Sequence, residues 1–459
     1  MRGHQTNSHR SHLMRFMLPL ALAALGLLLC ALLVPAEISL VKQQLIGFPD
    51  SDAATHQARP FVLAGLFFLP ALAALAYTLS GTMDRYMARE FGGIFGICLG
   101  ALVMIWLLMD LSDKIGDFRQ SDHIFRTILE FYGTRSPAIL LLLLPYSLLL
   151  ALLYSLGKLS GSREIIAMIQ GGRSVIRITR PLLVAGGFLS LLSLGLNYHW
   201  APIAEGRQDE ILAEAQGKAA TEATHVLYRD PSSRRLWMIG AFPRDYHLGA
   251  PLANVEITST REDHTLETRI SAKTATWDRE DHRWTFGEAI VGTYQPNQAP
   301  IFTRHPGPLT MDAWPETPWQ LIKPGLSAAY LGIPDLKTWL HASRNHRNFT
   351  EPAAYETQWH YRWALPFACL VTVLLATPLG IHFARRGPGG GVFLAVVLSA
   401  LMLLLSSISI ALGEAGTIRP IYAAWLPNLA FALLGIYLFR RRITGQPIYR
   451  SIQRLFAND

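Results

Sequence analysis

The sequence predicts a polytopic α-helical membrane protein with about eight transmembrane helices and one antiparallel β domain. Hydrophobic residues make up 51% of its 459 residues and charged residues only 16%, and the mean hydropathy is +0.25. These values are typical of membrane proteins. Eight apolar runs are long enough to cross a bilayer, whereas region 201–360 shows the alternation of β-strands.

The first apolar run follows a basic N-terminal segment, as the core of a signal peptide would. It is long for that core, and the sequence LVPA at 33–36 is a poor cleavage site, so an uncleaved span is favoured over a signal peptide. Pro137 and Pro181 open the fourth and fifth spans, where a missing N–H costs no hydrogen bond. The expected spans are 16–34, 61–80, 92–109, 137–156, 181–200, 361–383, 392–412 and 421–439.

Clusters of basic residues orient these spans. The segment 158–180 carries five Lys and Arg residues against the single acid Glu164, and Arg385-Arg386 and 440–442 follow the sixth and last spans. Basic residues are enriched on the cytoplasmic side of membranes, and all these clusters are cytosolic if both termini are cytosolic. The same count places region 201–360 in the periplasm of a bacterial cell.

Short alternating runs in this polar region predict a β domain of sandwich or jelly-roll type. Turn-forming residues such as those at 230–233 and 278–282 separate the runs, and a helix is expected at 334–343. All three cysteines lie in apolar runs, so neither a disulfide framework nor a metal site is expected. The alternating runs are 226–228, 236–239, 255–257, 270–277 and 284–286.

The basic segment 158–180 is expected to contain a short cytosolic helix at 160–172. Ser160 or Ser162 is a candidate cap, Glu164 suits the positive end of the helix dipole, and Gly171-Gly172 end the helix. Ile165, Ile166, Met168 and Ile169 form an apolar stripe. Such a helix is placed to be gripped by a soluble partner, or to rest on lipid headgroups as an ordinary amphipathic helix.

Several kinds of chemistry have no motif in this sequence. It contains no GxxxxGK[ST] phosphate loop, no HExxH zinc motif and no GxSxG nucleophile elbow. No cofactor is indicated, and the basic residues flank apolar runs rather than forming the basic, aromatic-bearing surface of a nucleic-acid-binding domain. We therefore expect no enzymatic activity, and energy for any transport against a gradient must come from a partner.

Ionisable residues at the ends of the third span are candidates for lipid contacts. Arg85 lies at its expected cytosolic end and Lys114 at its outer end. Such residues usually snorkel as simple anchors. Alternatively, a basic residue at the depth of Lys114 pairs with a phosphorylated lipid headgroup.

The order and spacing of several motifs resemble those of the YjgP/YjgQ permeases, the LptF/LptG subunits of the lipopolysaccharide exporter. The resemblance covers about four fifths of the chain, from about Met83 to the C-terminus, and WLPN with Asn428 leans toward the LptG-like branch. The family has six spans, so the spans at 16–34 and 61–80 are additional. The matching motifs are MDRYMAREF, SGSREIIAMIQGGRS, AP with Glu205, SAKTATWDREDHRWTF, RWALPFACLVTVLLATPLG, GPGGG and AAWLPNLAFALLGIYL.

The resemblance implies an ABC-type exporter in the bacterial inner membrane that lifts lipopolysaccharide from the outer leaflet. Two such permeases would pair around a cavity, and a cytosolic ATPase dimer would grip the helix at 160–172. The coupling residues would be Arg163, Glu164, Met168 and Gly171. The β-jellyroll would pass the lipid to a periplasmic bridge of similar jellyrolls by edge-to-edge pairing.

The resemblance also implies headgroup contacts, for which the candidates are Arg85, Lys114 and Arg207, although these are not in register with the family's basic residues. Two other functions remain open. The first alternative is a membrane-anchored sensor or scaffold with a ligand-binding β domain. The second is an export permease for another amphiphile. The expected domains are 1–81 with two added spans, 82–200 with the coupling helix, 201–345 as the β-jellyroll, and 346–459 with three spans and a cytosolic tail.

Overall fold

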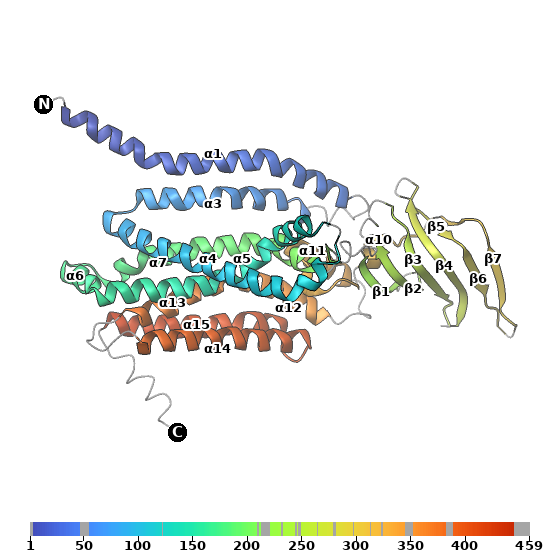
Figure 1. Ribbon diagram of the computed structural model, residues 1–459. Coiled ribbons are helices and arrows are strands. Elements are labelled where there is room, and N and C mark those ends of the chain that lie inside the picture. The colour runs from blue at the N-terminus through green and yellow to red at the C-terminus, as the bar shows by residue number, and fades with distance from the viewer. Residues whose placement is uncertain are drawn as a thin grey trace, which may run out of the picture.

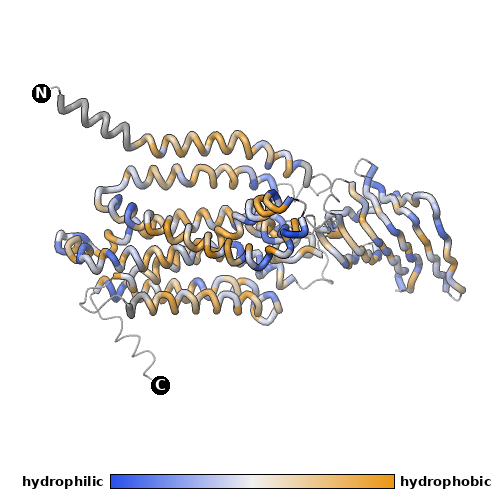
Figure 2. The backbone as a smooth tube through the Cα atoms, viewed as in Figure 1, coloured by the Kyte–Doolittle hydropathy of each residue, from blue (hydrophilic) through white to orange (hydrophobic). Residues whose placement is uncertain are grey.

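The protein is described from a computed structural model as a helical bundle with a β domain at one end (Figure 1). The short helix α6 (Glu164–Gln170) lies at the opposite end of the bundle. Apolar residues run along the helices, and polar residues gather at the α6 end and through the β domain (Figure 2). The structure describes residues 3–45, 55–212 and 221–444, except 122, 209–210, 231–232, 244–245, 247–248, 264, 279–280, 297, 313, 323–324, 345–351 and 382–388.

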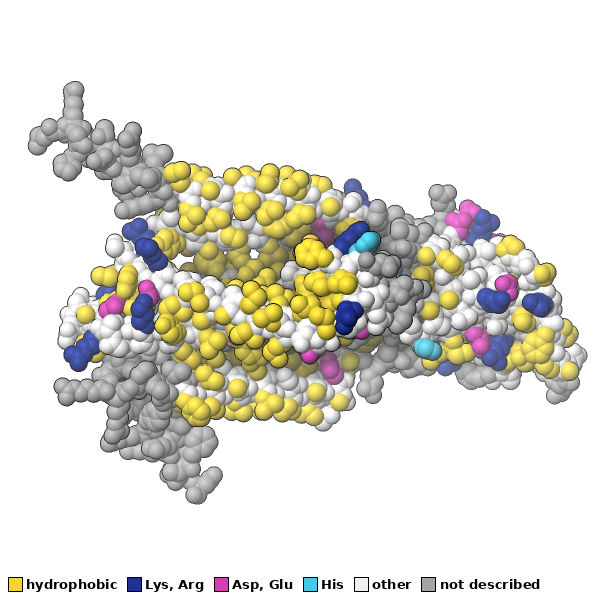
Figure 3. All heavy atoms as spheres, in the orientation of Figure 1, with side chains coloured by type: hydrophobic (Ala, Val, Ile, Leu, Met, Phe, Trp, Pro, Cys, Tyr) yellow, Lys and Arg dark blue, Asp and Glu magenta, His cyan; other side chains and the backbone are white. Residues whose placement is uncertain are grey.

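Seven helices among the described residues are long and apolar enough to cross a membrane, and an eighth candidate is a bent pair. This agrees with the expected number, and hydrophobic side chains cover the helical part of the surface (Figure 3). The seven helices are α1 (Gly3–Leu45), α3 (Arg59–Leu79), α4 (Thr82–Phe118), α5 (Ile124–Gly161), α7 (Val175–Tyr198), α14 (Gly389–Glu414) and α15 (Pro420–Ile443).

The sixth span, expected to be one helix at 361–383, is two helices. α12 (Pro352–Ala364) and α13 (Phe367–Gly380) meet at a bend of 51°. Pro366 lies in the break, where its missing N–H and its clash with the preceding residue interrupt a helix. The expectation of a continuous span was therefore wrong at this proline.

Side chains from neighbouring helices satisfy the carbonyl groups around this break. Asn197 Nδ2 of α7 donates to the Arg362 carbonyl at 2.7 Å, and Ser190 Oγ donates to the Pro366 carbonyl at 2.7 Å. Asn428 Nδ2 of α15 donates to the Ala364 carbonyl at 2.7 Å. An unsatisfied backbone group costs several kcal/mol in hydrocarbon, so these three contacts allow a broken helix at membrane depth.

The transmembrane core is centred on α5 and α13. Leu148, Leu152 and Leu156 of α5 are fully buried in one cluster with Val373 of α13. A Cβ on Gly435 of α15 would lie 3.2 Å from the Leu374 backbone carbon, so glycine there allows two helices to approach closely. The core thus joins helices that precede the β domain in the sequence with helices that follow it.

The two additional spans form a hairpin, α1 and α3, along one side of the bundle (Figure 1). α3 packs against α7, where Gly195 makes room for Leu66: a Cβ on Gly195 would lie 2.3 Å from Leu66 Cδ2. The hairpin therefore packs against the bundle at membrane depth as well as being joined to it by the chain.

The β domain is an antiparallel sheet that divides at its longest strand, β4. One end of β4 pairs with β5 and the other end with β6, so the sheet order β1-β2-β3-β4-β5-β8 has a branch to β6 and β7. The antiparallel domain is confirmed, and each predicted alternating run lies in one of β1 to β5. The strands are β1 (Thr221–Asp230), β2 (Arg235–Pro243), β3 (Leu252–Thr260), β4 (Leu266–Asp278), β5 (Arg283–Gly287), β6 (Ala289–Thr293), β7 (Ile301–His305) and β8 (Leu309–Met311).

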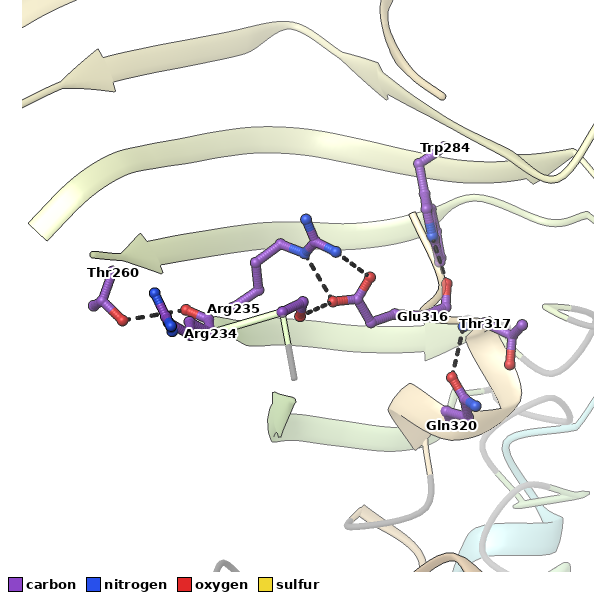
Figure 4. Close-up of polar contacts among 8 residues, drawn as sticks. Arg234, Arg235, Thr260, Trp284, Glu316, Thr317 and Gln320 are labelled. Atoms are coloured by element: carbon purple, nitrogen blue, oxygen red, sulfur yellow. Dashed lines mark hydrogen bonds and ion pairs between the residues drawn. The ribbon is translucent and has the colours of Figure 1, made fainter. Parts of the chain in front are cut away.

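An aromatic cluster forms the core of this domain. Trp237, Trp284 and Phe286 are fully buried, and Trp314 packs against Trp237 with ring centroids 5.5 Å apart. The buried Glu316 accepts hydrogen bonds from Arg235, and its carbonyl accepts one from Trp284 Nε1 at 2.8 Å (Figure 4). These contacts fix the chain between β8 and α10 (Pro318–Ile322) over the aromatic core.

Three further helices connect the β domain to the membrane. α8 (Trp200–Gly206) follows α7 directly, and the short η3 (Ala328–Tyr330) packs on it. The helix predicted at 334–343 is α11 (Ile333–Arg344), whose Trp339 stacks on Tyr355 of α12. α11 is thus the last element before the chain re-enters the bundle.

Replacing Asn428 with Leu should destabilise the protein by about 1–3 kcal/mol, because it leaves the Ala364 carbonyl buried without a hydrogen bond. The measurement is thermal unfolding of the purified protein in detergent. The control is Ser407→Ala, since Ser407 is on α14 and bonds only within its own helix. Equal stability of Asn428→Leu and the wild type would contradict the role given to Asn428.

Candidate functional site

The end of the bundle opposite the β domain contains α6, the helix expected to contact a partner. Its first flanking residue, Arg163, has a left-handed backbone with φ 60°, and Gly171 with Gly172 (φ 84°) ends it. The predicted glycine stop is therefore confirmed. The predicted serine caps were wrong: Ser160 Oγ donates to the Gly380 carbonyl, and Ser162 belongs to the end of α5.

The apolar stripe of α6 faces the transmembrane core. Ile165 is fully buried, and Met168 and Ile169 pack against the same cluster as the core of α5. The exposed residues around α6 are Gly161, Ser162, Arg163, Ala167, Gln170, Gly171 and Gly172. A partner at this end would meet these residues. Ile165, Met168 and Ile169 anchor the helix on the core, but Met168 is only partly buried, so its contact with a partner stays a prediction.

The first turns of α4 hold the segment around α6 at three points. Tyr86 donates its hydroxyl to Glu164 Oε2 at 2.7 Å, and Asp84 pairs with Arg173 at 3.0 Å. Glu90 pairs with Lys158 at the end of α5. The segment 158–173 is therefore joined on both sides of α6 to the start of one transmembrane helix.

A second group of polar residues lies at the other end of α4. Asp110 accepts hydrogen bonds from Tyr132 at 3.0 Å and from Arg135 at 3.2 Å. Lys114 Nζ lies 4.5 Å from the centre of the Phe131 ring and donates to Gln208 Oε1 at 3.3 Å. Arg207, next to Gln208, is exposed. The end of α4, the start of α5 and the segment after α8 thus bring Lys114 and the Arg207 segment together at the end of the bundle that faces the β domain.

Arg85 does not belong to this group. It lies in the first turn of α4, and its separation of 29 positions from Lys114 corresponds to about 43 Å of helix. The three candidates for substrate contacts are thus divided between the two ends of α4. Only Lys114 and Arg207 lie at the same end.

The described residues contain no group of three His, Cys, Asp or Glu side chains that could hold a metal ion. Cys30, Cys98 and Cys369 are free thiols. The chemistry of this chain is therefore argued from its charged and hydrogen-bonding side chains.

Comparison with known proteins identifies the family. Residues 85–441 match the family described as lipopolysaccharide export system permease LptF/LptG. The chain belongs to this family. Similar relatives are the LptF proteins of Escherichia coli K12 and Shigella flexneri, each 24% identical over 371 residues, covering 77% of this chain and 93% of the relative.

Membership makes this chain a multi-pass protein of the inner membrane and a permease of the lipopolysaccharide export family rather than an enzyme. The LptF/LptG match begins at 85, so the α1/α3 hairpin precedes it. The expectation from Asn428 favoured the LptG-like branch, whereas these two relatives are LptF proteins. Asn428 has a structural role at the break between α12 and α13.

Sequence reasoning missed the residues that hold the coupling segment. The contacts of Asp84 and Tyr86 were not predicted, although both residues lie in the motif MDRYMAREF. The signal available was this motif's position at a helix start beside a basic cytosolic loop. It does not show which loop residue each side chain contacts.

Replacing Tyr86 with Phe should loosen α6 without unfolding α4, because it removes only the hydrogen bond to Glu164. A loss of about 0.5–1.5 kcal/mol corresponds to amide exchange in α6 that is up to about tenfold faster, measured by hydrogen–deuterium exchange in nanodiscs. The matched control is Tyr154→Phe, at an exposed tyrosine of α5. Unchanged exchange in α6 would show that the Tyr86 contact does not hold it.

Proposed function

We propose that this chain is the permease subunit of an ABC transporter that extracts lipopolysaccharide from the inner membrane and passes it to a periplasmic bridge. A cytosolic ATPase dimer would supply the energy, and a second permease of the same family would complete the membrane cavity. Membership of the LptF/LptG family supports this reading. Both termini would be cytosolic and the β domain periplasmic.

The observation that carries the proposal is the single helix α4. Its start is bonded to the segment around α6, and its far end carries Lys114 beside Gln208. A push on α6 by an ATPase would therefore act on the same helix that ends at the proposed headgroup contacts. At 37 residues, α4 is longer than the roughly 20 residues that a bilayer requires, so both ends reach beyond the hydrocarbon.

The basic clusters support the proposed orientation. Arg442 of α15 donates to the Pro378 carbonyl at 3.0 Å, and Ser160 donates to the neighbouring Gly380 carbonyl. The cluster 440–442 and the segment 158–180 therefore lie at the same end of the bundle. Basic residues at one end favour a cytosolic location for that end, which leaves the β domain on the other side.

The proposed contacts with other proteins use surfaces that are open in this chain. Little of the apolar surface of α4 and α14 is buried, as expected for helices that face lipid or a second permease. β7 is an edge strand of the branched sheet, and its Ile301 and Phe302 are exposed. An edge strand can add a strand from another sheet, which is the contact expected for a bridge of similar β domains.

Reversing the charge at Glu164 should abolish ATPase-driven lipid release from reconstituted vesicles, because a carboxylate beside the exposed face of α6 would become a cation. Glu164→Gln, which keeps an oxygen to accept the Tyr86 hydrogen bond, should retain part of the activity. The control is Glu262→Arg, at an exposed acid of the β domain. Release by Glu164→Arg at the wild-type rate would contradict the coupling role of Glu164, whereas no ATPase-driven release by the wild-type protein would favour the alternative of a membrane-anchored sensor or scaffold.

Replacing Lys114 with Glu should reduce the amount of phosphorylated lipid that co-purifies with the protein. The substitution replaces the ammonium group with a carboxylate, which repels the negatively charged phosphate. Mass spectrometry of the extracted lipid gives both its amount and its identity. Lys337→Glu, at an exposed residue of α11, is the control. An amphiphile other than lipopolysaccharide in the wild-type extract would favour the alternative export permease, and unchanged lipid in Lys114→Glu would exclude the headgroup role of Lys114.

A further inference from the structure

A buried cluster of polar side chains lies where the α1/α3 hairpin, the end of α7 and α11 meet. All its members are at most 9% exposed. α11 lies at the end of the bundle that faces the β domain (Figure 1). The cluster consists of Glu37, His56, Arg59, His199, Asp335 and Thr338.

Within the hairpin, Glu37 of α1 and Arg59 at the start of α3 form an ion pair of 2.6 Å. Both charges are buried, so removing either partner would leave the other charge uncompensated, which is strongly destabilising. The pair joins the two helices at the end where His56 precedes α3. The ion pair therefore holds α1 and the start of α3 together next to His56.

His56 connects the hairpin to α11. Its Nε2 atom lies 3.3 Å from Thr338 Oγ1 and 3.9 Å from Asp335 Oδ1. These two α11 residues are three apart in sequence, so they lie on the same face of the helix. One imidazole of the hairpin thus contacts α11 at two points.

Asp335 is also held by α7. Its Oδ2 atom lies 3.5 Å from His199 Nδ1, so the carboxylate lies between one imidazole of the hairpin and one of the bundle. Burial lowers the pKa of His199, although Asp335 opposes this effect. The backbones approach closely as well: a Cβ on Gly332 would lie 2.8 Å from the Tyr198 carbonyl oxygen.

We propose that the α1/α3 hairpin is a brace, meaning that it holds α11 in position between the β domain and the bundle. His56 is the residue of the hairpin that positions α11. α11 is the last helix between the β domain and the bundle, and it continues onto α12 through the stacked rings of Trp339 and Tyr355. Leu336 of α11 also packs in one cluster with Ala328 and Leu331, so fixing α11 holds the segment by which the chain leaves the β domain. The hairpin precedes the LptF/LptG match at 85–441, so the brace is an addition to the six-span permease.

The test is hydrogen–deuterium exchange of the full chain in nanodiscs. His56→Ala should make the amides of 333–344 exchange at least tenfold faster and leave those of α13 unchanged. Thr338→Val added to His56→Ala should have little further effect, because both remove the same contact. Lys337→Ala, at the exposed face of α11, is the control. Unchanged exchange in 333–344, or equally faster exchange throughout the bundle, would overturn the proposal.

A distance measurement separates positioning from stability. Spin labels at Gln57 of the hairpin and Glu262 of the β domain, with the three native cysteines replaced by alanine, should give a broader distance distribution in His56→Ala than in the parent. His56→Gln, which can still bond to Thr338, should restore the narrow distribution. An unchanged distribution in His56→Ala would overturn the brace. Neither measurement uses an ATPase or a lipid substrate, so its outcome is independent of the proposed transport function.

Discussion

The need to satisfy backbone carbonyls inside the hydrocarbon determines how this bundle is assembled. The break at Pro366 frees carbonyl groups that water cannot reach, and Asn197, Ser190 and Asn428 donate to them from α7 and α15. Residues on both sides of the β domain in the sequence therefore meet at one point. Three polar side chains opposite the bend between α12 and α13 stabilise it, while apolar side chains pack α5 against α13.

Ionic and hydrogen-bonded contacts at the two ends of the bundle position the residues to which we assign functions. At one end, Asp84, Tyr86 and Glu90 join the start of α4 to the segment around α6. At the other end, Lys114 lies beside Gln208, and a separate buried cluster around Asp335 joins the hairpin and α7 to α11. Because one continuous helix connects the first two groups, the proposed function has a displacement at α6 act along α4 on the end that carries Lys114.

Most of the fold followed from the sequence, and the errors have specific causes. The apolar runs gave the spans and the alternating runs gave β1 to β5, but β6 to β8 are three to five residues long and carry little pattern. Pro366 was read as part of a continuous span because hydropathy does not register a break. The stripe on α6 was predicted correctly as a stripe, but periodicity does not show what a face packs against, and Met168 faces the core.

The sequence by itself determined which segments are apolar enough to enter the membrane, which alternating runs form strands β1 to β5, and which end of the bundle carries the basic clusters. These properties depend on the composition and period of neighbouring residues, so they can be read locally. Tertiary structure alone decided that Arg85 and Lys114 lie at opposite ends of α4, that Tyr86 contacts Glu164, and that His56 reaches Asp335. Such contacts join residues that are up to about 280 positions apart, and their geometry depends on how whole helices pack.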